Sequence, residues 1–128
     1  MNHPLVITEP EDLHKVIDAI HDRWFDLDKI QFEAGTSVLQ IPFSESYDRG
    51  WKKFMFWRKD RHGFRYEFSL EIKHVTKYEI SDTAKVGIYN FGEIKYDRKG
   101  KLIITTGIPL GFTVYVSRLE VAVKETGD

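Results

Sequence analysis

The residue types best suited to chemistry gather near the end of a helical pattern, in "LHKVIDAIHDRWF" (13–25). On a helix, which advances about 100° per residue, His14, Asp18 and His21 share one flank of the apolar stripe, and Asp22 follows. Such groups could bind a metal ion or transfer a proton. The two histidines, however, are seven positions apart, which separates them by about 10 Å along the axis. We therefore predict local hydrogen bonds for this polar cluster, and keep as an alternative a metal-assisted enzyme whose site other strands complete.

Other catalytic motifs are missing from the sequence. It contains no GxxxxGK[ST] or GxGxxG phosphate loop, no GxSxG nucleophile elbow and no cysteine. His74 lies three residues after Glu71 and could pair with it, whereas Asp26 and Asp28 are expected to be solvated loop carboxylates. The sequence therefore favours a binding protein over an enzyme, and we assign no catalytic residue, no metal ion and no cofactor.

The most unusual stretch is "WKKFMFWRKDRHGFRY" (51–66), in which six basic residues face one acid for a net charge of +5. If 51–58 and 64–72 pair as strands, the loop between them is a basic tip. Cations beside aromatic rings suit an acidic protein partner, and they also suit single-stranded nucleic acid, where rings stack on bases. An alternative is that the aromatics fill the core while the charges face solvent. We predict a partner-binding surface, with an acidic protein preferred over nucleic acid, formed by Trp51, Lys52, Lys53, Trp57, Arg58, Lys59, Arg61 and Arg65.

Charge is unevenly distributed along the chain. Residues 9–33 carry eight acidic and three basic side chains, a net charge of −5, although the whole chain has a net charge of −1. This two-sided distribution favours head-to-tail or two-fold self-association, so a homodimer is a further expectation.

The elements that must position these residues begin with one helix, predicted at about 9–23. Thr8 and Glu11 have the spacing of a capping box, and Pro10 lies in the tolerant first turn. The apolar stripe consists of Leu13, Val16, Ile17, Ile20 and Trp24.

Strand patterns follow the helix. A hairpin is expected around "AGT" (34–36), a half-buried antiparallel strand at 64–72, and a turn at "DRKG" (97–100). In the last stretch the apolar positions change parity, which requires a bulge or bend near 117–118. The further strands are expected in "VTKYEI", "GIYNFGEIKY", "KLIITTGI" and "FTVYVSRLEVAV".

The whole pattern indicates an α+β fold in one domain spanning 1–128, with one N-terminal helix on a twisted, mostly antiparallel sheet or small sandwich of roughly seven or eight strands. The N-terminus lacks the basic region and apolar run of a signal peptide, and no stretch is apolar enough to span a membrane. We therefore expect a cytoplasmic protein with no membrane partner.

A resemblance adds to this picture. A helix running into "IHDRWFDLDKIQFE", then "FSLEIKHVTKYEI", "IYNFGEIKY" and a terminal "GFTVYVSRLEVAV", resembles small bacterial proteins of unassigned function and one group of immunity proteins of polymorphic toxin systems. The shared motif is the His21-Asp22 pair at the end of the helix, and the stretch 51–66 departs from the group. Immunity proteins bind and occlude a toxin, so the resemblance implies binding, as an immunity-type or adaptor protein, and no catalytic role.

Overall fold

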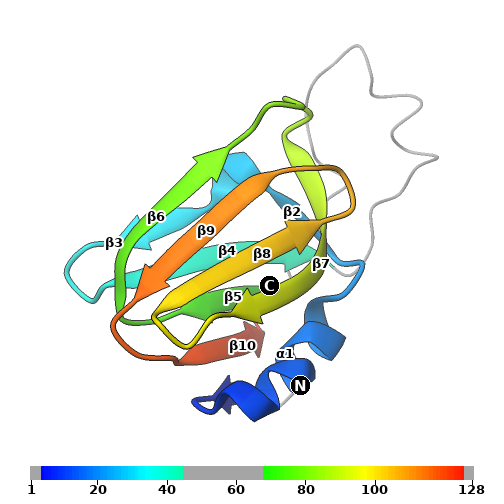
Figure 1. Cartoon of the computed structure of the whole chain (residues 1–128). Helices are drawn as coiled ribbons and strands as arrows, with labels where there is room; N and C mark the ends of the chain where they lie inside the picture. The colour runs from blue at the N-terminus through cyan, green and yellow to red at the C-terminus, as the bar shows by residue number, and fades with distance from the viewer. Residues whose placement is uncertain (1–3, 45–67, 126–128) are drawn as a thin grey trace.

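The computed structural model describes residues 4–44 and 68–125, and Figure 1 shows their arrangement. This part of the chain holds one α-helix, α1 (Leu13–Ile20), and two short 3-10 helices, η1 (Pro10–Asp12) and η2 (Leu27–Lys29). It also holds ten strands: β1 (Leu5–Ile7), β2 (Trp24–Asp26), β3 (Gln31–Glu33), β4 (Val38–Ser44), β5 (Phe68–Ile72), β6 (Val75–Ser81), β7 (Ile88–Tyr96), β8 (Lys101–Thr106), β9 (Gly111–Val116) and β10 (Val121–Glu125).

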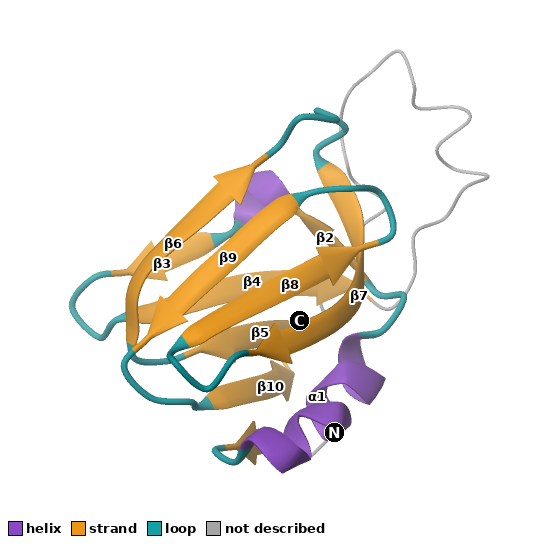
Figure 2. Cartoon of the chain, in the orientation of Figure 1, coloured by secondary structure: helices purple, strands orange, loops and turns teal. Residues whose placement is uncertain are grey.

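The strands form two facing layers that share β7. The strand order is β1-β10-β5-β4-β2-β7-β8-β9-β6, with β3 paired to β4 beside β2, and all these pairs are antiparallel. In Figures 1 and 2, β6, β9 and β8 lie in front of β3, β4, β5 and β10. The first half of β7 pairs with β2 in one layer, and its second half pairs with β8 in the other. This strand therefore belongs to both layers and connects them.

The bend in β7 falls at a glycine. Its register with β8 shifts between Phe91 and Ile94. A Cβ atom on Gly92 would lie 2.7 Å from the hydroxyl oxygen of Thr105, so this position suits a residue without a side chain. Thr105 instead accepts a hydrogen bond from the backbone N–H of Glu93 at 2.8 Å, which satisfies a donor at the irregular step.

Aromatic side chains from both layers fill the core. The rings of Phe25 on β2 and Phe91 on β7 stack with centroids 4.4 Å apart, and Phe112 on β9 lies 6.3 Å from Phe25. All three are fully or almost fully buried. Helix α1 packs on β7, β10 and β1, and buries Leu13, Val16 and Ile20 beside this core.

The helix is shorter than the sequence predicts, and its predicted cap was wrong. Glu9 occupies the N-cap position of η1 and Asp12 that of α1, and neither side chain caps the helix. At the other end, Phe25 would lie about 120° from Leu13 on a continued helix, away from the apolar stripe. Pairing in β2 buries Phe25 completely, so the helix ends at residue 20 and the chain begins a strand.

The predicted class, mostly antiparallel sheet with an N-terminal helix, is confirmed, but the described chain has ten strands and not seven or eight. The hairpin at 34–36 and the turn at 97–100 are where the sequence places them. The bend near 117–118 is also present, and it divides the last pattern into β9 and β10, which lie in different layers. The short strands β1 and β2 were missed.

Two further expectations need correction. Asp26 is not a solvated loop carboxylate: it is buried, and its Oδ1 accepts a hydrogen bond from the backbone N–H of Asp28 at 2.9 Å. The outer face of β5 is also more enclosed than a half-buried strand, because β10 and β4 flank it and leave Ser69 and Glu71 only 9% exposed. Within residues 4–44 and 68–125, none of the helices is long and apolar enough to cross a membrane.

Candidate functional site

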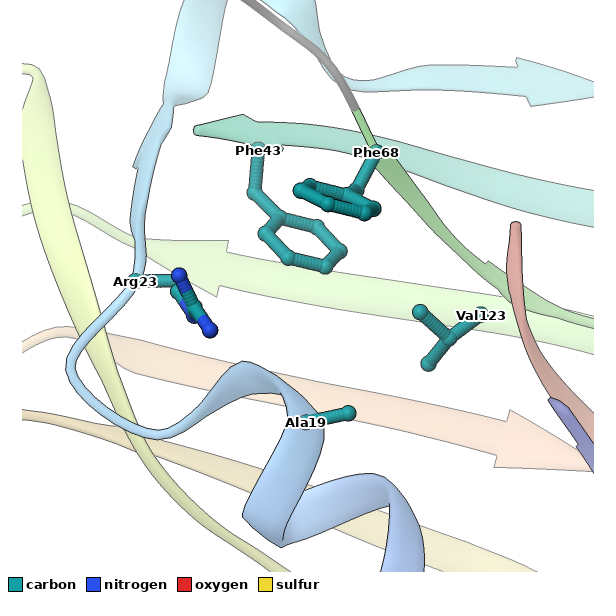
Figure 3. A pocket seen from close by; sticks show the side chains of 5 residues that line it. All are labelled: Ala19, Arg23, Phe43, Phe68 and Val123. Atoms are coloured by element: carbon teal, nitrogen blue, oxygen red, sulfur yellow. The ribbon is translucent and has the colours of Figure 1, made fainter. Parts of the chain in front are cut away.

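A cavity of about 290 Å³ opens between α1 and the back layer of the sandwich (Figure 3). Its wall combines one small side chain from the helix, side chains from three strands and one cation: Ala19, Arg23, Phe43, Phe68 and Val123. Mostly apolar lining with one polar group that fixes orientation is the usual composition of a small binding pocket.

The aromatic wall follows from the register of two strands. Phe43, near the end of β4, lies opposite Phe68, the first residue of β5, and their rings stack with centroids 5.5 Å apart. Phe43 also meets the ring of Phe91 edge-on at 5.6 Å, which ties the wall to the core. The short side chains of Ala19 and Val123 leave the space in front of the rings open (Figure 3).

Arg23 is positioned by the tight connection from α1 to β2. Its backbone N–H donates to the carbonyl of Ile20 at 2.8 Å, and its carbonyl accepts from Phe91 at 2.9 Å. The preceding Asp22 adopts a left-handed conformation (φ 62°) and donates its N–H to Phe91. The guanidinium therefore stands on a fixed backbone at the edge of the cavity (Figure 3). A guanidinium beside an apolar wall suits a group that carries a carboxylate or carbonyl next to an apolar moiety.

The predicted polar cluster has local contacts. Nδ1 of His14 lies 2.9 Å from the carbonyl of Glu11, and Nδ1 of His21 lies 3.4 Å from a carboxylate oxygen of Asp22. These side chains and Asp18 are all exposed on the outside of the helix and its end. Across residues 4–44 and 68–125, no three His, Cys, Asp or Glu side chains come together as a metal site.

The predicted partner-binding residues lie outside the described residues: Trp51, Lys52, Lys53, Trp57, Arg58, Lys59, Arg61 and Arg65. The points where this stretch joins the fold are described. Ser44 ends β4 and Phe68 begins β5, and these two strands are neighbours. Residues 45–67, which include the basic aromatic stretch, join these two strand ends in the sequence, and Phe68 is part of the aromatic wall of the cavity.

A charged cluster that the sequence did not reveal connects two loops. Glu120 contacts Nζ of Lys73 at 3.2 Å and Nε2 of His74 at 2.9 Å, and the Arg118 guanidinium lies within 3.8 Å. Hydrogen bonds from His74 and then Lys73 lower the pKa of the Glu120 carboxyl from its ordinary value. Nε2 of His74 also lies 2.9 Å from Nε of Arg118, and a single Nε2 cannot donate to Glu120 and accept from Arg118 at once.

His74 does not pair with Glu71, a pairing that the sequence left open. Glu71 instead contacts Lys124 at 3.0 Å, because β10 lies alongside β5 and Lys124 is opposite Ser69, two residues from Glu71 on the same face. The true partner of His74, Glu120, is 46 residues away. Only the fold brings the loop after β5 beside the loop before β10, so no local pattern could have indicated the pair.

In comparisons with known proteins, the chain matches no protein-family model, no curated protein sequence and no solved structure.

Proposed function

We propose that this chain is a small binding protein, of the immunity or adaptor type, which holds an acidic protein partner at the β4–β5 end of the sandwich. One observation carries the proposal: the apolar cavity edged by Arg23 lies at the ends of β4 and β5, and residues 45–67, which join these strands in the sequence, include the basic aromatic stretch. The cavity offers an apolar anchor point, and the stretch 51–66 carries an excess of positive charge.

The cavity and the stretch 51–66 would contribute different kinds of contact to one interface. Aromatic and arginine side chains are the residues that most often dominate the binding energy of interfaces. The cavity, at about 290 Å³, is large enough to receive one apolar side chain of a partner. A carboxylate next to that side chain would face Arg23, and further acids would face the net charge of +5 in 51–66. Such charges chiefly increase the association rate and the specificity.

The resemblance to immunity proteins supports the same class of function, because those proteins act by occupying a surface of another protein. It supports binding only and transfers no residue-level role, since the shared motif, His21-Asp22, lies at the end of α1 and does not line the cavity.

The first experiment is affinity capture from native lysate with protein and nucleic acid both identified. A variant with Lys52, Lys53, Arg58 and Lys59 changed to Glu is compared with wild type. A control with the same change in charge replaces four lysines that the structure shows exposed elsewhere: Lys15, Lys29, Lys95 and Lys99. We expect a protein partner that wild type and control retain and the first variant loses. Equal capture by all three would show that this stretch does not bind the partner. Capture of nucleic acid alone would show that the partner is nucleic acid and not an acidic protein.

The cavity is tested separately by filling it. Ala19→Leu adds apolar volume beside Phe43 and Phe68 without changing the charge, and Ala84→Leu adds the same side chain at an exposed loop position. We expect the first substitution to weaken capture of the same partner about tenfold or more and the second to leave it unchanged. If Ala19→Leu bound the partner as well as wild type and unfolded at the same temperature, the cavity would not be part of the interface.

A further inference from the structure

A second surface, away from the cavity, is formed by the edge strand β6. One edge of β6 pairs with β9, and within residues 4–44 and 68–125 no strand pairs with its other edge. All residues from Thr76 to Ser81 are exposed. An exposed edge strand of this length presents backbone donors and acceptors on which another strand can pair.

The core-facing side of β6 is also uncovered. Tyr78 lies opposite Val114 and Ile80 lies opposite Phe112, and both partners on β9 are buried core residues. Tyr78 and Ile80 nevertheless remain 38% and 36% exposed. The Tyr78 ring contacts Phe32 on β3, at a centroid distance of 5.5 Å, and Phe32 is itself 36% exposed. Apolar side chains thus gather along the open edge between the two layers.

The other side of β6 carries two opposite charges that are fixed by the same neighbour. Nζ of Lys77 lies 4.6 Å from the centroid of the Tyr115 ring, and the Tyr115 hydroxyl donates to Glu79 at 3.3 Å. Because successive side chains of a strand alternate between faces, Lys77 and Glu79 lie on one face and Tyr78 on the other. A lone lysine would discourage edge pairing, whereas a Lys and a Glu two residues apart can specify a register.

Two copies of β6 can pair antiparallel about a two-fold axis perpendicular to the sheet. Such an axis places equivalent faces together, so the pairing must be centred on a residue. Centring on Lys77 or on Glu79 would set like charges opposite each other. Centring on Tyr78 sets Lys77 opposite Glu79 of the partner subunit, and Glu79 opposite the partner's Lys77. Directly opposite side chains interact, favourably for opposite charges and unfavourably for like charges.

We propose that β6 is the interface of a homodimer, formed by antiparallel pairing of this strand with its copy in the register centred on Tyr78. The pairing joins the front layers of two molecules into one continuous sheet. On the core-facing side it places Tyr78 against the partner's Tyr78, and the regular pairing extends as far as the irregular step of β6 between Val75 and Lys77. These contacts cover the apolar edge that Phe32 and Tyr78 leave open.

This dimer does not depend on the proposed partner site. The cavity lies between α1 and the back layer, whereas β6 is the last strand of the front layer, on the other side of the molecule (Figure 1). Loss of the dimer therefore leaves the cavity intact, and failure of partner capture leaves the dimer unaffected.

Charge reversal followed by charge exchange tests the register, with sedimentation velocity over a range of protein concentrations as the readout. Lys77→Glu alone and Glu79→Lys alone each set two like-charged pairs across the axis, so each should weaken dimerisation about tenfold or more. The double variant Lys77→Glu/Glu79→Lys restores opposite charges and should dimerise like wild type. An equimolar mixture of the two single variants should form heterodimers.

A matched control exchanges Glu93 and Lys95, which have the same spacing and exposure on β7 and should have no effect on association. Circular dichroism confirms that each variant is folded. A wild-type chain that stays monomeric at the highest concentration would overturn the proposal. Single variants that dimerise like wild type would place any dimer elsewhere, and failure of the double variant to recover would reject this register.

Discussion

Nε2 of His74 lies 2.9 Å from Oε1 of Glu120, although the two residues are 46 positions apart in the chain. The contact fastens the loop between β5 and β6 to the loop between β9 and β10. Backbone hydrogen bonds run in parallel with it, from Lys73 to the carbonyl of Glu120 and from Ser117 to that of His74, both at 2.9 Å. His74 itself has a left-handed backbone (φ 58°), so the side-chain contact also offsets a strained conformation. Each of these two loops runs from one layer of the sandwich to the other, so the contact joins the two connections between the layers.

Stability at acid pH should depend on Glu120. Because hydrogen bonds from His74 and Lys73 lower the pKa of this carboxyl in the folded state, its contribution is complete above the ordinary value of 4.5 and is lost as the pH falls through the lower folded value. Glu120→Gln should cost about 1–2 kcal/mol of unfolding free energy at neutral pH, and the difference from wild type should shrink below pH 4.5. Urea titrations at several pH values measure both effects.

The matched variant is His74→Asn, because asparagine tolerates the left-handed backbone and cannot reproduce the contact of Nε2. It removes the largest cause of the lowered pKa, so it should also reduce the difference between neutral and acid stability. If both variants lost stability by the same amount at every pH, Glu120 would not titrate with folding, and the contact would act through packing alone.

Core packing gives a second prediction, at Phe25. This ring is fully buried and stacks on Phe91, so Phe25→Ala should lower the unfolding free energy by about 3–5 kcal/mol, through lost burial and a cavity between the layers. Phe32→Ala on the neighbouring strand β3 is the control. It removes the same side chain from an exposed edge and should cost about 1 kcal/mol or less. Denaturant unfolding checks both, and equal losses would contradict the assignment of Phe25 to the core.

Much of this fold is predictable from local patterns. Alternating apolar residues and turn residues place the hairpin around 34–36, the strand ending at Ile72 and the turn at 97–100. The strands that were missed, β1 and β2, contain three residues each and are stabilised by neighbours far away in sequence. Trp24 continues the helical spacing, and only the pairing of β2 with β4 and β7 decides against the helix.

The candidate site was less predictable. The sequence directs attention to His14 and His21 because they share a helix flank, but their partners are the Glu11 carbonyl and the Asp22 carboxylate. The cavity combines Ala19, which has no chemical signature, with residues from strands that are distant in sequence. Such a site exists because side chains are small where a helix and three strands meet, and the composition of the sequence does not indicate it.

The turn after β7 gives a third prediction, at Gly100. Its φ of +98° disfavours other residues, and a Cβ atom there would lie 2.6 Å from the carbonyl oxygen of Val116. Gly100→Ala should therefore lower the unfolding free energy by about 1–3 kcal/mol. Gly35→Ala, at a position with nothing within 4 Å of the new Cβ, should change it by about 0.5 kcal/mol or less. Thermal unfolding compares the two, and a neutral Gly100→Ala would mean that the turn rearranges at no cost.

The fourth prediction concerns alkaline pH and Tyr89, whose ring is buried while its hydroxyl donates to Asp82 in the loop before β7. Burial, and then the hydrogen bond to Asp82, raise the pKa of this phenol above its ordinary value of 10.0. The folded state then holds the proton more tightly, so the contribution of Tyr89 is complete below pH 10.0 and is lost as the pH rises through the higher folded value. Tyr89→Phe should cost about 1 kcal/mol at neutral pH and flatten this alkaline decline.

Tyr115→Phe, which removes the hydroxyl that contacts Glu79 at the surface, is the control for loss of a phenol. Urea unfolding above and below pH 10 measures the effect, and an alkaline decline as steep in Tyr89→Phe as in wild type would assign the decline to other groups.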